Sequence, residues 1–209
     1  YGMSLNNQGD IDTQTIVGAI ATGTHGAGVT LPAISSQMIA ARVVTASGEI
    51  LDLSEKKDGD LFRAFRCSLG LLGVTISVTL QAVPSEVFDH SSAVYPNTYL
   101  PNFREIEYAV PFGRFEEAFE EIRHLRMTRY PDEHFPVECR PVLADDSMLS
   151  AYAGRDGYAL SISGSLDAST WDLLKACDAI LDRYDARPHW GKHHFMTAER
   201  LERIYPEYD

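Results

Sequence analysis

The stretch from Gly18 to Gly28 constrains the fold of this chain more than any other, because it holds four glycines and two threonines in eleven residues. Glycine has no Cβ, so it adopts positive φ readily and lets the backbone approach a ligand closely. Successive N–H groups in such a stretch can turn inward and bind a pyrophosphate, and Thr22 and Thr24 add two hydroxyl donors. A glycine-rich turn between two strands is the other interpretation, and composition alone leaves both open.

The composition argues against several classes of partner and site. The 209-residue chain is 44% hydrophobic, which is enough for a core in one domain or two small ones. Its net charge of −12 disfavours binding to nucleic acid or to an anionic membrane surface. The three cysteines are odd in number and far apart, which does not suggest a disulfide framework. No run of about 18 apolar residues is present. We therefore expect no nucleic-acid partner and no transmembrane segment.

The pattern of apolar residues predicts a β-rich first part and a mixed second part. Two β-rich runs at 41–45 and 49–53 flank Ala46-Ser47-Gly48, which is typical of a β-hairpin. We expect a loop at 57–60, a short helix at 61–67 and a strand at 74–80. After Val83-Pro84, strands are expected at 106–110, 135–142 and 158–163. Helices are expected at 113–127, at 171–184 after an N-cap at Ser169 or Thr170, and at 197–204. This order predicts an α+β unit with helices on one face of the sheet.

Two clusters of polar residues are candidates for a functional site. Glu138 and Arg140 are two apart on a predicted strand, so they share a face. Such a pair is often only a salt bridge. The other cluster, 189–194, contains three histidines, but Pro188 and Gly191 argue against the helix that a metal-binding His-x-x-x-His pair needs. We therefore predict no metal site, and we interpret Lys192 as a hydrogen-bond donor to a substrate.

Three motifs, in this order along the chain, resemble the vanillyl-alcohol-oxidase superfamily, the FAD enzymes with a PCMH-type FAD-binding domain. They are the glycine-rich stretch, Glu138-Cys139-Arg140 and Arg187-Pro188-His189-Trp190-Gly191-Lys192. Within that group the chain is similar to the aldonolactone oxidase and alditol oxidase branch. The resemblance implies that residues 1–88 are the C-terminal lobe of the FAD-binding domain. Residues 89–209 would be the substrate (cap) domain, an α+β unit with an antiparallel sheet and helices on one face.

The resemblance also implies an FAD-dependent oxidase or dehydrogenase that oxidises a CH–OH group of a sugar-derived substrate by hydride transfer to flavin N5. Residues 107–111 resemble the lactone-oxidase cap, which favours an aldono-1,4-lactone such as L-gulono- or D-arabinono-1,4-lactone. The alternatives are an alditol such as xylitol or sorbitol, and a non-catalytic remnant that has lost its flavin. O₂ is the expected electron acceptor, with another acceptor as the alternative. We expect a cytoplasmic location and leave peripheral membrane association open.

The resemblance assigns roles to individual residues. Arg140 would stabilise negative charge developing at flavin N1 and C2=O, Glu138 would hold Arg140 and accept from a substrate hydroxyl, and Lys192 would donate to a substrate oxygen. Asp10 and Ser163 would also bind substrate, although Ser163 fits an ordinary strand serine equally well. The expected cofactor-binding residues are Asp10, Thr15, Gly18, Thr22, Gly23, Thr24, His25, Gly73 and Thr75.

Gly9 bears on oxygen access. In the family, the segment equivalent to 7–10 passes beside the reactive edge of the flavin, and its residue aligned with Gly9 is Gly or Ala. Because Gly9 has no Cβ, we predict an open path for O₂; a simple turn before Asp10 is the alternative.

The resemblance further implies that the chain is a fragment. The family's first FAD lobe, part of the passage between 86 and 103, and the C-terminal tail are missing. The histidine that often binds FAD covalently belongs to that first lobe, so the flavin linkage stays undetermined.

Overall fold

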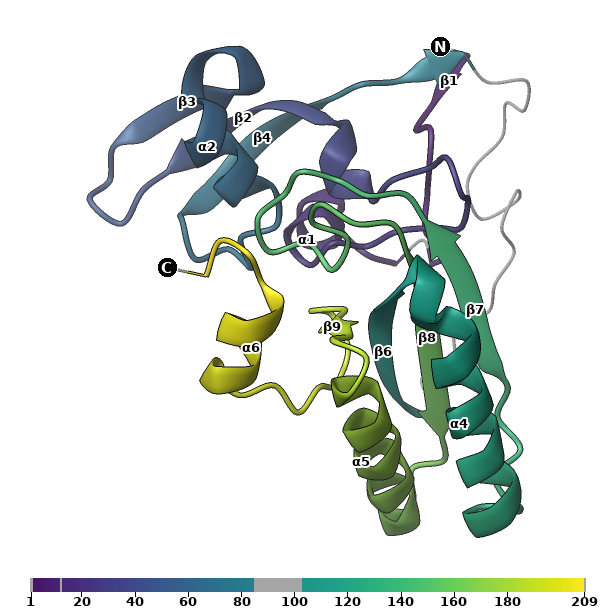
Figure 1. Cartoon of the computed structure of the whole chain (residues 1–209). Helices are drawn as coiled ribbons and strands as arrows, with labels where there is room; N and C mark the ends of the chain where they lie inside the picture. Colours follow the sequence, from purple (N-terminus) through teal and green to yellow (C-terminus); the bar gives the residue numbers. More distant parts are fainter. Residues whose placement is uncertain (1, 12, 85–102, 209) are drawn as a thin grey trace.

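The computed structural model describes residues 2–11, 13–84 and 103–208, which form two α+β units with separate hydrophobic cores (Figure 1). The boundary at residue 88 that we predict between them lies outside the described residues. Helices are combined with antiparallel sheets in both units, which confirms the expected α+β class.

The first unit is built on a three-stranded antiparallel sheet of order β3-β2-β4. Its strands are β2 (Met38–Val44), β3 (Ile50–Ser54) and β4 (Val74–Leu80). Val44 pairs with Ile50, so β2 and β3 form the predicted hairpin. The other elements are helices α1 (Ile16–Ala21) and α2 (Glu55–Arg66), the 3-10 turn η1 (Ile34–Gln37) and the short antiparallel pair of β1 (Met3–Ser4) with β5 (Val83–Pro84).

Helix α2 begins earlier than the sequence predicted. It starts at Glu55 rather than at residue 61, and it bends at Gly59, whose φ of 39° a glycine adopts without strain. The Asp58 carboxylate accepts a hydrogen bond from the Ser54 N–H at 2.8 Å, which stabilises the first turn. The break that we expected within 57–60 is confirmed at Gly59, whose backbone angles are not helical, but the residues before it form a helical turn rather than a loop.

The second unit is a four-stranded antiparallel sheet of order β7-β8-β6-β9, with α4 and α5 on one face as predicted (Figure 1). Its strands are β6 (Arg104–Pro111), β7 (Val137–Val142), β8 (Gly157–Gly164) and β9 (Arg187–Pro188). Its helices are α4 (Phe115–Arg129), α5 (Ala168–Asp182) and α6 (Ala198–Ile204), and the 3-10 turn η2 (Phe112–Arg114) precedes α4. The N-cap of α5 is Asp167, the last extended residue, rather than Ser169 or Thr170. None of the described helices is long and apolar enough to cross a membrane.

Strand β6 has two chemically different faces, because side chains alternate along a strand. Ile106, Tyr108 and Val110 are fully buried in the core under α4 and α5. Glu105 and Glu107 occupy the alternate positions and face the side of the sheet that carries no helix. The open face of this sheet is therefore acidic along its central strand β6.

Backbone hydrogen bonds join the first unit to this sheet. The Gly28 N–H donates to the Pro141 carbonyl at 2.7 Å, and the Leu143 N–H donates to the Leu31 carbonyl at 3.1 Å. The segment after the glycine-rich stretch thus runs parallel to the end of β7. This connection holds the glycine-rich stretch against the open face of the sheet.

Gly26 is required where two segments of the first unit approach each other. A Cβ at this position would lie 2.2 Å from the Gln8 carbonyl oxygen and 2.3 Å from Asn7 Oδ1. No side chain fits at such distances, so any larger residue must displace the backbone of 7–8.

We therefore expect Gly26→Ala to lower the free energy of unfolding by about 1–3 kcal/mol, the usual cost of overpacking. Gly113→Ala is the matched control, because nothing lies within 4 Å of its Cβ position. Urea unfolding of both variants measures the difference. Equal unfolding midpoints would show that the close approach at Gly26 is absent in solution.

Candidate active site

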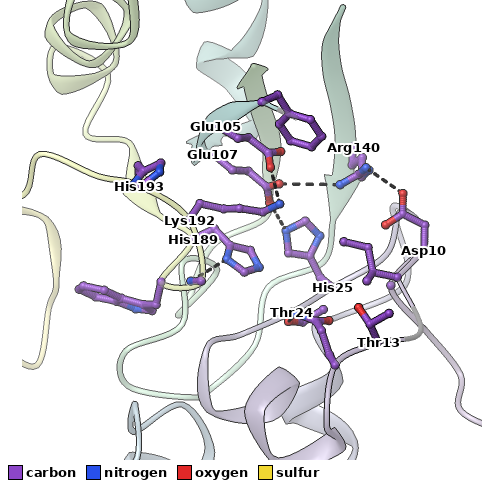
Figure 2. Close-up of a pocket in the computed structure, with 16 residues that line it drawn as sticks. Asp10, Thr13, Thr24, His25, Glu105, Glu107, Arg140, His189, Lys192 and His193 are labelled. Carbon is purple, nitrogen blue, oxygen red and sulfur yellow. Dashed lines mark hydrogen bonds and ion pairs between the residues drawn. The ribbon is translucent and has the colours of Figure 1, made fainter. Parts of the chain in front are cut away.

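A cavity of about 460 Å³ opens between the glycine-rich stretch and the open face of the four-stranded sheet (Figure 2). Its size is that of a small-molecule site. The first unit contributes Gly9, Asp10, Ile11, Thr13, Gln14, Thr24 and His25. The second unit contributes Phe103, Glu105, Glu107, Arg140 and residues 189–193.

Arg140 is a fixed cation at this cavity. Its guanidinium bonds to the Glu138 carboxylate, and it lies 3.4 Å from Asp10 Oδ2 and 3.7 Å from Glu107 Oε2. Burial alone would lower the pKa of Arg140, but Glu107, Glu138 and Asp10 raise it overall. The structure thus brings Glu138 and Arg140 together as expected, but Glu138 is half exposed and is not among the cavity-lining residues.

Lys192 reaches the cavity from the segment after β9. The backbone of this segment continues along β6, because the His189 N–H donates to the Glu107 carbonyl at 2.8 Å and the His193 N–H donates to the Glu105 carbonyl at 3.1 Å. The Lys192 ammonium forms an ion pair with the Glu105 carboxylate, which also accepts a hydrogen bond from the Ser161 hydroxyl. Two cations from opposite edges of the sheet therefore line one cavity (Figure 2).

Glu105 and Glu107 are site residues that the sequence-based candidates omitted. The signal was present, because two glutamates alternate with Ile106, Tyr108 and Val110 in a predicted strand. A strand with one apolar face toward a core and carboxylates on the other face places those carboxylates together.

Glu107 lies at the centre of a buried polar cluster. His25 Nε2 is 2.8 Å from Glu107 Oε1, and the Tyr152 hydroxyl lies 3.2 Å from the same ring nitrogen. Burial alone would raise the pKa of Glu107, but the neighbouring His25 holds it well below the usual range. Burial also lowers the pKa of His189 to about 4, so that ring is neutral at physiological pH.

His25, Glu107 and His189 also satisfy the spacing of a metal site, since their ligand atoms all lie within 4.8 Å of one another. The hydrogen bonds argue against that use. His189 Nδ1 accepts the Gly191 N–H at 3.0 Å, so the neutral ring carries its proton on Nε2, and neither nitrogen offers a free lone pair. We interpret the cluster as a buried hydrogen-bond network.

Not all of the expected cofactor residues lie at this cavity. Asp10, Thr24 and His25 line it, and Thr15, Gly18, Thr22 and Gly23 do not. Gly73 and Thr75 line a separate pocket of about 90 Å³ between α1, α2 and β4. Ser163 pairs with Glu105 in the sheet but is not among the cavity-lining residues.

Several N–H groups of the glycine-rich stretch, which we expected to point toward a pyrophosphate, form hydrogen bonds within the chain instead. α1 occupies the first part of the glycine-rich stretch, and its N-cap Thr15 accepts the Gly18 N–H at 3.2 Å. At the other end of α1, the N–H groups of Thr22, Gly23 and Thr24 donate to helix carbonyls at 3.2, 3.1 and 2.9 Å. These donors are satisfied within the chain, so they do not turn toward a pyrophosphate.

Comparison with known proteins identifies the family. The D-arabinono-1,4-lactone oxidase family matches residues 67–209, and the FAD binding domain family matches residues 1–54. The chain is 28% identical over 306 residues to L-gulono-1,4-lactone dehydrogenase of Mycobacterium tuberculosis, a match that covers 99% of this chain and 71% of that protein. It is 25% identical over 313 residues to L-gulonolactone oxidase of Mus musculus, with 100% and 71% covered.

A third relative matches a shorter span. The chain is 37% identical over 143 residues to mitochondrial L-galactono-1,4-lactone dehydrogenase of Arabidopsis thaliana, which covers 68% of this chain and 22% of that protein. The alignments to the bacterial and mouse proteins are longer than the 209-residue chain, so those relatives have residues within the matched span that this chain lacks. The chain therefore belongs to the D-arabinono-1,4-lactone oxidase family of FAD-dependent oxidoreductases, which act on CH–OH groups.

Proposed function

We propose that the protein oxidises the hydroxyl-bearing carbon of an aldono-1,4-lactone, with flavin N5 as the hydride acceptor. One observation carries this proposal: Arg140 and Lys192 converge on the cavity that Thr24 and His25 of the glycine-rich stretch also line. The lactones in the names of the three relatives support the substrate class.

The cavity residues fit the flavin end of FAD better than its pyrophosphate. When bound, FAD supplies the acceptor for two electrons. The cations Arg140 and Lys192 complement the N1–C2=O edge of a flavin, where negative charge develops during reduction. The N–H groups of Thr22 to Thr24 are already used within the chain, so they are poor candidates for phosphate binding.

Each polar residue of the cavity then has a separate task. Arg140 is held by its acidic neighbours, so its positive charge is in place before the reaction and needs no reorganisation. Lys192, beside Glu105, would donate a hydrogen bond to a substrate oxygen. Glu138 would hold Arg140, and its contact with a substrate hydroxyl stays a prediction, because Glu138 does not line the cavity.

Anaerobic mixing of the purified full-length protein with candidate substrates tests the proposal. L-gulono- and D-arabinono-1,4-lactone should bleach the absorbance of the oxidised flavin, whereas xylitol and sorbitol should not. Bleaching by the polyols alone would make the protein an alditol oxidase, and a protein purified without any flavin absorbance would favour the non-catalytic remnant.

A cytoplasmic location stays a prediction as well, because the Arabidopsis relative is named as mitochondrial.

Replacing Arg140 tests its role directly. Arg140→Ala should slow flavin reduction by roughly 10²–10³, the size expected for the loss of one charge-stabilising donor. Arg42→Ala is the matched control, because Arg42 forms only an exposed ion pair with Asp52 on the hairpin. Stopped-flow absorbance measures both rates. A near-normal rate in Arg140→Ala with flavin still bound would reduce Glu138 and Arg140 to a structural pair.

The electron acceptor depends on Gly9, which lines the cavity. An added Cβ would lie 3.2 Å from Thr24 Cγ2 and 3.7 Å from the His25 carbonyl oxygen. Alanine at position 9 therefore requires only a small displacement of the Thr24 side chain. Its methyl group would make the cavity narrower at this point. The relatives' names include both oxidases and dehydrogenases, so the choice of O₂ is our proposal.

We expect Gly9→Ala to lower the second-order rate of flavin reoxidation by O₂ while leaving reduction by the lactone nearly unchanged. Gly113→Ala, distant from any close contact, is the control. The measurement mixes the reduced enzyme with buffers of known oxygen content. If the reduced wild-type enzyme persists for minutes in air, the protein is a dehydrogenase, and Gly9 does not provide a path for O₂.

A further inference from the structure

Glu107 is the one acidic residue classed as buried among the residues that the structure describes, and it is 2% exposed. A carboxylate in such a place requires close partners, because an unpaired buried charge is strongly destabilising. Its partners come from both units: His25 lies in the glycine-rich stretch of the first, and Arg140 lies on β7 of the second. Glu107 is therefore a point at which the FAD-binding part and the four-stranded sheet meet.

The hydrogen bonds of His25 indicate its charge. Nδ1 lies 2.8 Å from the Gly26 carbonyl oxygen, and Nε2 lies 2.8 Å from Glu107 Oε1. A carbonyl oxygen and an ionised carboxylate can only accept hydrogen bonds. Both ring nitrogens must then donate, which requires a proton on each. When Glu107 is ionised, the geometry therefore requires His25 to be an imidazolium.

We propose that Glu107 is a positioning residue that keeps His25 positively charged and Arg140 in place, so that the cavity has two fixed positive charges on adjacent walls. Figure 2 shows dashed lines that join the Glu107 carboxylate to both His25 and Arg140. The pairing of His25 with Glu107 is inferred from the geometry alone. Its effect on catalysis depends in addition on the proposed function. Neither nitrogen of His25 is available to a ligand, so His25 acts through its charge rather than through a contact.

The groups around Glu107 support an ionised carboxylate. They come from every element packed against it: His25 from the glycine-rich stretch, Arg140 from β7, Tyr152 from the turn before β8, His189 and Lys192 from the segment after β9, and Glu105 from β6 itself. Burial raises the pKa of Glu107, and the neighbouring His25 and Lys192 lower it overall. Burial raises the pKa of Tyr152 well above its usual value, so that hydroxyl stays neutral.

Such an arrangement suits a reaction that creates negative charge in the cavity. Charges fixed by a buried partner are oriented before the reaction, and in a water-poor site they act more strongly than in solution. Loss of the carboxylate would remove the reason for His25 to hold its second proton and would free Arg140 from its buried anchor. The remaining partners of Arg140, Glu138 and Asp10, are about half exposed and hold it less firmly.

Nuclear magnetic resonance of histidine side chains tests the pair without any assay of activity. The full-length protein is labelled with ¹⁵N in its histidine rings and measured at neutral pH with flavin bound, and His25→Gln assigns the signals. We expect both ring nitrogens of wild-type His25 to show imidazolium shifts. A neutral ring for His25 in the wild type would overturn the proposal, and this result requires no variant of Glu107 to fold.

Matched variants test whether Glu107 is the cause. Glu107→Gln keeps the size of the side chain and removes its charge, so His25 should become neutral, and Glu107→Asp should restore part of the imidazolium signal. Glu120→Gln is the control, because Glu120 pairs with Arg123 on the exposed side of α4. A folded Glu107→Gln protein in which His25 remains an imidazolium would show that another group holds the charge.

The rate of flavin reduction gives the functional consequence. Glu107→Gln should reduce it by roughly ten- to a hundredfold, and the rate should acquire a dependence on pH through the neutral range, where an unpaired histidine titrates. A merely structural role would lower the rate without this new pH dependence and would contradict the positioning role. If His25 is an imidazolium but no lactone reduces the flavin, the charge pair stands and the proposed function fails.

Discussion

The buried contact between His25 and Glu107 is the interaction on which the cavity depends. It connects the glycine-rich stretch of one unit to strand β6 of the other. His25 Nε2 and Glu107 Oε1 are 2.8 Å apart. The backbone bonds of Gly28 and Leu31 to the end of β7 bring these segments together, and the hydrogen bond between His25 and Glu107 then fixes the side chains. Because both partners are buried, a shift of either unit would leave a charge without its partner.

The alternation of side chains along β6 explains how one strand can serve both the core and the cavity. Ile106, Tyr108 and Val110 pack under the helices, and this packing fixes the register of the strand. A slip of one residue would move the glutamates into the core, which makes the register strongly specified. The hydrophobic core thereby determines where Glu105 and Glu107 lie. Arg140 comes from β7 and Lys192 from the segment after β9, at the two opposite edges of the sheet.

Much of the fold could be predicted from local patterns, and much of the site could not. The hairpin at Ala46-Ser47-Gly48 and the helical spacing of Phe115 and Ile122 depend on neighbours in sequence, and both predictions are confirmed. The helical turn from Glu55 to the kink at Gly59 is not predicted, because the polar residues and the glycine at 57–60 are typical of a loop. The N–H cradle stays a prediction for residues 25–27, whereas the N–H groups of 22–24 bond to carbonyls at the end of a short helix. The alternation along β6 indicates the face on which Glu107 lies, but its contact with His25, a residue distant in sequence, depends on the fold and cannot be predicted from a local pattern.

We propose that the cavity between the glycine-rich stretch and the four-stranded sheet holds the flavin ring beside Arg140. A crystal structure of the flavin-loaded full-length protein tests it most directly. We expect the ring inside this cavity, with a guanidinium nitrogen of Arg140 within about 3.5 Å of a flavin or substrate oxygen or nitrogen. A flavin ring seated elsewhere, with Arg140 far beyond hydrogen-bond distance from both the flavin and the substrate, would contradict it.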